Sequence, residues 1–336
     1  MEYKIYESLL NELYDKKRYV EYYKQIEVIF NGLKVKLMEP NKKLINIRKN
    51  KIEKEKFINL QSKFLFNDIK EFIKNNNNNY YEVKFKTLTL YICTNKDDIN
   101  SLLNEIINIC EWLKDTTKNK DSIKPLTIYI ILTNYNKYFN FNDIMRPKNI
   151  NSGYCDLQKR EIVIIREEEI LKVLIHELIH YYGLDKKGMI KEDDIYFYVN
   201  GREPLYNEAL TEYMSLLYYN YYISIKKSYN YVNLILKERV NSLINVCKLM
   251  KMYKIKDVNK FVEKDNGIKE ETNSFSYIFI KYLLLHYLIL PEDMNKNYDK
   301  ILEYILKLDN LRQFNYLCND NINRIEFEVN FKLSIN

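Results

Sequence analysis

The 336-residue chain contains few residues of the kinds that usually interrupt or cross-link a fold. It has 6 glycines, 5 prolines, 3 histidines and 5 cysteines. The cysteines are odd in number, scattered, and form no C-x-x-C pair, which argues against both a disulfide framework and a cysteine-based zinc site. A reducing, intracellular compartment, most simply the cytoplasm, is therefore expected. The cysteines are Cys93, Cys110, Cys155, Cys247 and Cys318.

Long hydrophobic runs and blocks of one charge are also scarce. The longest apolar stretch, residues 277–290, is too short to span a bilayer and carries Lys281 and His286, so it predicts a buried helix and no membrane partner. The start of the chain shows no basic segment followed by an apolar run, so no signal peptide is expected. The net charge of +7 is spread through alternating lysine and glutamate. No nucleic-acid partner is therefore predicted, although a basic balance alone would be consistent with one.

What the chain does contain predicts an α+β fold. Apolar residues spaced three and four apart predict a helical N-terminal region over residues 1–79, ending in the asparagine run 75–79. The remainder, 80–336, is expected to form one domain with an upper lobe of about 80–183 and a helical lower lobe of about 205–336.

The upper lobe has the pattern of a small mixed sheet with helices. Alternating β-branched residues predict strands at 83–94 and 126–132, and two short strands joined by a polar turn within 150–166. Helices are predicted at 97–114 and 167–183, the second with acidic residues in its first turn and a glycine at its end.

The helix expected at 167–183 carries the sequence HELIH, which holds two of the three histidines. On a helix, His176 and His180 share one face and can direct two imidazoles at one metal ion. Glu177 borders that face, where it can reach a metal-bound water without being a ligand. The spacing therefore predicts a zinc site with Glu177 as general base.

Two continuations of this motif could supply a third ligand. In the first, H-E-x-x-H-x-x-G-x-x-H, a glycine turns the chain back towards a third histidine. Gly183 is in the right place, but Lys186 stands where the third histidine should be, and Asp185 is one residue out of register. The alternative is a glutamate from a second helix, in YNEALTEY (206–213). There Glu208 and Glu212 lie four apart, so that one carboxylate can bind the metal while the other accepts the free N–H of a ligand imidazole.

With HELIH followed by NEALTE, the chain resembles the gluzincin zinc metallopeptidases, and the run around the first motif is similar to predicted metallopeptidases of large DNA viruses. The resemblance implies a zincin-like fold and one Zn²⁺ per chain, held by His176, His180 and Glu208. It implies Glu177 as general base and Glu212 as a residue that supports the metal site by holding a ligand histidine. It also implies a protein or peptide substrate cleaved by an endopeptidase. Glu212 departs from the pattern, since the thermolysin-like families prefer Asp there. If the chain is viral, it would act in the host cell or the virion.

Four further residues are considered for a role in the reaction. Tyr277, at the polar start of the 277–290 helix, is the preferred candidate to stabilise the oxyanion, whereas His286 fits a satisfied core residue better. Gly153 would let a substrate approach an edge strand at 150–155, or would simply be a hairpin glycine. Cys155 fits a free core thiol better than a metal ligand.

A different class of protein, a structural or interaction protein that retains a zinc site, remains the alternative, and an intact Glu177 argues against it.

Overall fold

The computed structural model describes residues 16–32, 45–49, 54–60, 65–75, 78–117, 124–138, 144–185, 205–263 and 266–287, with 289, 301 and 305. Within them the fold is α+β, as predicted, with helices and one six-stranded sheet. The chain forms two compact units. The sheet unit is Lys34–Lys137 with Asn151–Leu184, and the helical unit is Met1–Leu33, Tyr138–Ile150 and Asp185–Asn336.

The six strands of the sheet unit lie in the order β1-β2-β3-β4-β6-β5. Strands β3, β4 and β6 are parallel, whereas β1-β2, β2-β3 and β5-β6 are antiparallel pairs. The sheet is therefore mixed, and β1 and β5 are its two edges. The strands are β1 Asn46–Lys49, β2 Asn79–Phe85, β3 Leu88–Thr94, β4 Leu126–Ile131, β5 Gly153–Asp156 and β6 Glu161–Ile164.

Most predicted strands are confirmed, but the single strand expected over 83–94 is wrong. This segment holds the end of β2 and all of β3, joined by a tight turn at Lys86–Thr87. Lys86 adopts the left-handed conformation (φ 51°) that glycine or asparagine usually supplies in such turns. The alternating pattern therefore runs through the turn without a turn residue to mark it.

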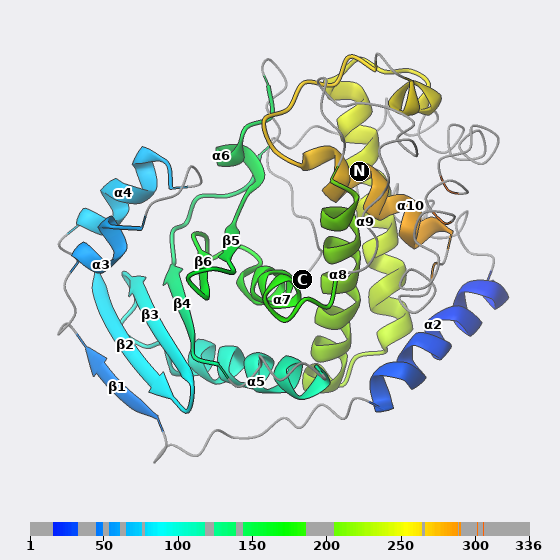
Figure 1. Ribbon diagram of the computed structural model, residues 1–336. Helices are drawn as coiled ribbons and strands as arrows, with labels where there is room; N and C mark the ends of the chain where they lie inside the picture. The colour runs from blue at the N-terminus through cyan, green and yellow to red at the C-terminus, as the bar shows by residue number, and fades with distance from the viewer. Residues whose placement is uncertain are drawn as a thin grey trace. The chain divides into compact units, whose positions relative to one another are not determined.

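Helices cover both faces of the sheet in this unit (Figure 1). On one face, α3 (Glu55–Ile58) and α4 (Asn67–Lys74) bury Phe57, Ile69 and Ile73 in a cluster that Tyr154 of β5 joins. Successive strand residues point to opposite faces, so Gly153 faces the other side. There α7 (Ile170–Tyr182) contacts β5 and β6, and α5 (Asn100–Thr116) packs on α7.

The helical unit is built around α8, most of whose side chains are buried. The N-terminal helix α2 joins it, where the hydroxyls of Tyr22 and Tyr213 lie 2.7 Å apart and Phe30 stacks on Tyr221. No described helix combines the length and the apolar character needed to cross a membrane. The elements of this unit are α2 Lys16–Gly32, α6 Pro147–Ile150, α8 Tyr206–Lys227, α9 Tyr231–Met252, the 3-10 helix η4 Val258–Val262, the π-helix η5 Ser276–Ile280 and α10 Lys281–His286.

The division into two units does not follow the domain boundary that the sequence predicts after residue 79. Of the elements described within the expected N-terminal region, α2 belongs to the helical unit, whereas β1, α3 and α4 belong to the sheet unit. Residue 79 itself begins β2, so the asparagine run leads directly into the sheet. The first 15 residues of the expected helical region lie outside the described residues.

Glu270, in the helical unit, caps the start of the segment that leads into η5. Its Oε2 accepts a hydrogen bond from the backbone N–H of Phe275 (2.9 Å) and one from the Ser274 hydroxyl. Next to it, Met145 bridges in parallel to the 269–271 segment. Burial raises the pKa of Glu270 from 4.5 to about 7, because the ionised carboxylate loses its hydration.

This shift predicts a pH-dependent stability. Because the folded-state pKa is raised, the contribution of Glu270 is fully present below pH 4.5 and is lost as the pH rises through about 7. The full loss amounts to roughly 3 kcal/mol by linkage. Thermal unfolding of wild type and Glu270→Gln at pH 5 and pH 8 measures it, and the wild type should lose more stability than the variant. Equal losses in the two proteins would contradict the assignment.

Candidate metal centre

The helix α7 carries the two histidines. It begins at Ile170, three residues later than expected, so the acidic residues 167–169 precede the helix and do not occupy its first turn. Glu169 stands at the helix start in a left-handed conformation (φ 56°) and pairs with the ammonium of Lys137, both side chains being 1% exposed. A second contact, from the backbone N–H of Lys137 to Glu168 (2.7 Å), anchors the same end of the helix.

The other end of α7 stops at Gly183, as the sequence predicts. Gly183 has a φ of 64°, and its N–H donates to the carbonyl of His180. The N–H of Leu184 then donates to the carbonyl of Ile179 at 3.0 Å. These two hydrogen bonds satisfy the carbonyls of Ile179 and His180 in the last turn of the helix.

Along α7, the two imidazoles lie on one face, as their spacing predicts. The ring centroids of His176 and His180 are 4.9 Å apart and nearly perpendicular. His176 is buried and His180 is half-buried. Glu177 is 6% exposed, so its carboxylate sits in a partly desolvated position beside the histidine face.

Glycine at position 153 allows β5 to approach α7 closely. A Cβ there would lie 2.9 Å from the Val163 carbonyl oxygen, 3.0 Å from Val173 Cγ1 and 3.1 Å from Glu177 Oε1. Contacts this short leave no room for a side chain. Gly153 therefore places the edge strand directly against the Glu177 carboxylate. Cys155, two residues on, is half-buried and is not part of a disulfide.

The acidic residues of the second motif lie in the first two turns of α8. Glu208 is half-buried and accepts a hydrogen bond from the hydroxyl of Tyr277 at its Oε2 (3.2 Å). Glu212 is buried, and its Oε1 lies 3.9 Å from Nζ of Lys281, whose side chain is 1% exposed. Sequence reasoning missed Lys281 as a partner, although Tyr277 and Lys281 repeat the four-residue spacing of Glu208 and Glu212.

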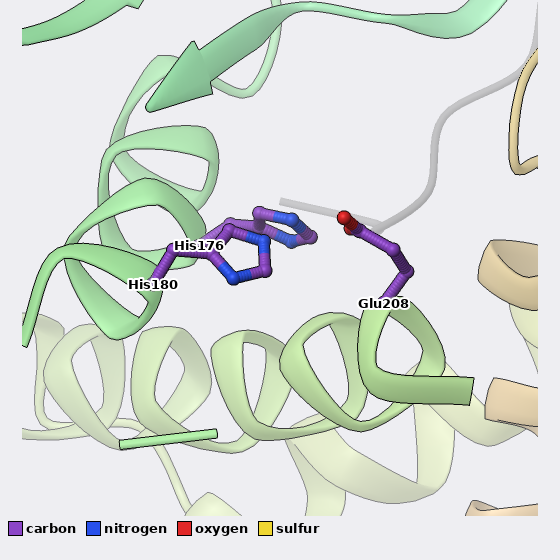
Figure 2. Close-up of side chains that lie close together, drawn as sticks. All are labelled: His176, His180 and Glu208. Atoms are coloured by element: carbon purple, nitrogen blue, oxygen red, sulfur yellow. The ribbon is translucent and has the colours of Figure 1, made fainter. Parts of the chain in front are cut away.

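His176, His180 and Glu208 can each offer one ligand atom, and these three atoms lie within 4.8 Å of one another (Figure 2). Two imidazoles and one carboxylate are a donor set that zinc takes in catalytic sites. The cluster consists of the three residues that the resemblance implies as ligands, and their role as ligands stays a prediction.

The two residues considered as alternatives have other partners. The hydroxyl of Thr211 lies at hydrogen-bond distance (3.0 Å) from Oδ2 of the buried Asp185. Nδ1 of His286 lies 3.1 Å from the guanidinium of Arg239 and 3.2 Å from the Tyr282 hydroxyl. Because a guanidinium only donates, Nδ1 accepts, which is the behaviour of a satisfied neutral histidine.

Comparison with known proteins gives one partial relative. The chain is 36% identical over 75 residues to an uncharacterized protein, R210, of Acanthamoeba polyphaga mimivirus. The alignment covers 22% of this chain and 19% of the mimivirus protein. No family model matches the chain, and no solved structure matches it.

Proposed function

We propose that the protein is a zinc-dependent peptidase of gluzincin type with a zincin-like fold, acting as an endopeptidase on protein or peptide substrates. The observation that carries the proposal is the cluster of His176, His180 and Glu208. Glu177, adjacent in sequence to one of these donors, supplies the general base that a purely structural zinc site does not need. The alternative, an inactive interaction protein that keeps the metal, leaves the buried Glu177 without a role.

The proposed chemistry divides between the metal and the chain. Zinc, when bound by the three donors, would polarise the scissile carbonyl and lower the pKa of water. The Glu177 carboxylate would accept a proton from the attacking water and pass it to the leaving amine.

The edge strand β5 offers a place for the substrate backbone. An extended peptide could add to β5, which is an edge strand of the described sheet, by main-chain hydrogen bonds. Because Gly153 lies against Glu177, a peptide paired there would run close to the general base. We propose Gly153 as the residue that permits this approach.

Metal analysis tests the proposal. The wild type, purified without added metal, is expected to contain one zinc per chain. Glu208→Ala should bind zinc more weakly by at least roughly tenfold, since even losing an outer partner of a ligand costs that much. Mass spectrometry gives the stoichiometry, and competition with a chelator gives the affinity.

The half-exposed Glu271, which pairs with Arg146, supplies the control. Glu271→Ala removes a carboxylate of the same unit and should leave the zinc affinity unchanged. Full zinc affinity in Glu208→Ala would move the third ligand elsewhere, with Asp185→Ala as the next variant. A wild type that takes up no zinc even after reconstitution would overturn the peptidase assignment.

A further inference from the structure

Two side chains of one helical segment each contact a glutamate of α8. The Tyr277 hydroxyl donates to Oε2 of Glu208, and the Lys281 ammonium lies 3.9 Å from Oε1 of Glu212. Both pairs repeat at a spacing of four residues, the spacing at which side chains of a helix stand one above the other. The segment η5–α10 therefore makes two contacts with α8, one helical turn apart. In each, a hydroxyl or an ammonium group faces a glutamate carboxylate.

We propose that Tyr277 is a positioning residue for the metal ligand Glu208, and that Lys281 supports the same helix face by neutralising Glu212. The inference rests on the proposed zinc site. By bonding to Oε2, the Tyr277 hydroxyl restricts the rotation of the Glu208 carboxylate. A hydrogen bond to the outer oxygen of a ligand orients that ligand and raises metal affinity.

The surroundings of Tyr277 suit this role. Its side chain is 9% exposed, so a charge-assisted bond to a carboxylate is stronger there than it would be in water. It lies in the π-helix η5, and such one-turn insertions into α-helices occur frequently at functional sites. Its own backbone N–H is bonded to the carbonyl of Asn273 at 3.0 Å, which ties the residue to the preceding turn.

This assignment differs from the oxyanion role that the sequence suggests for Tyr277. A tyrosine hydroxyl has one proton to donate, and in the structure that proton goes to Glu208. The same hydroxyl cannot also donate to a developing oxyanion while the bond persists. Tyr277 therefore acts on the reaction through Glu208.

The test is zinc affinity, measured by chelator competition on the full chain, for Tyr277→Phe and the matched control Tyr282→Phe. Tyr282 is fully buried on the same helical segment, and its hydroxyl bonds to His286. Tyr277→Phe is expected to weaken zinc binding by roughly 10- to 100-fold. Tyr282→Phe should change it by about twofold at most, the spread found for independent sites.

A double-mutant cycle separates positioning from a general structural effect. In a Glu208→Ala background, Tyr277→Phe should have no further effect on zinc affinity, because the group that it orients is gone. The inference is overturned if Tyr277→Phe binds zinc as tightly as wild type, or if it weakens binding equally with and without Glu208. Wild type that fails to bind zinc at all would instead overturn the proposed function, and this inference with it.

Discussion

Replacement of Glu177 by glutamine is expected to lower the rate of peptide hydrolysis by roughly a thousandfold or more while leaving zinc content unchanged. Glutamine keeps the size and the hydrogen-bonding oxygen of the side chain but cannot accept a proton from water. Because Glu177 is buried and lies against Gly153, an isosteric change avoids repacking the contact between β5 and α7. Cleavage of a peptide library, followed by mass spectrometry, measures the rate.

The matched control is Glu167→Gln. Glu167 precedes α7 and pairs with Lys96 at the surface, where its side chain is 45% exposed. This control should hydrolyse peptides at the wild-type rate. If Glu177→Gln cleaves as fast as wild type, the general-base mechanism is wrong, whereas loss of zinc from this variant would mean that it damages the site itself.

Replacement of Lys281 by methionine is expected to destabilise the helical unit by about 3–5 kcal/mol. The substitution leaves the Glu212 carboxylate buried without the ammonium that lies 3.9 Å from it. A buried charge that loses its partner carries most of its desolvation penalty uncompensated. Urea unfolding followed by circular dichroism gives the free energy of unfolding.

The double variant Glu212→Gln with Lys281→Met is the internal check on this second prediction. Since neither charge is then left buried alone, the double variant should be more stable than Lys281→Met. Simple addition of the two single losses would show that the pair is not coupled. A loss below about 1 kcal/mol in Lys281→Met, the range of an exposed ion pair, would contradict the prediction outright.

The histidine helix could be predicted from sequence because its signals are local. The spacing of His176 and His180, the apolar residues between them and the stop at Gly183 all act within one helix, and α7 ends where they indicate. The pair Glu208 and Glu212 is likewise defined by one turn of α8. Helical periodicity places such side chains on a common face without any knowledge of the tertiary fold.

The parts that escaped prediction depend on tertiary contacts or on unusual backbone conformations. The left-handed residues Lys86 and Glu169 set the β2–β3 turn and the start of α7, yet neither is a residue type that favours that conformation. All four residues of the short strand β1 are exposed, so β1 shows no alternation of burial from which its pairing with β2 could be predicted. The contacts of Tyr277 and Lys281 join segments about seventy residues apart in the sequence.

The division of the chain into interleaved segments has a consequence for the order of folding. All of the sheet unit has been synthesised once Leu184 has emerged, so the histidine helix can be ordered early. The helical unit draws on both ends of the chain, since the Tyr22 hydroxyl donates to the carbonyl of Ile289. Contacts between segments so distant form slowly, because the intervening loop must close first. Binding of a metal by all three proposed ligands would then belong to the last stage of folding. In the nascent chain, the two histidines would be ordered before the glutamate that completes the proposed ligand set.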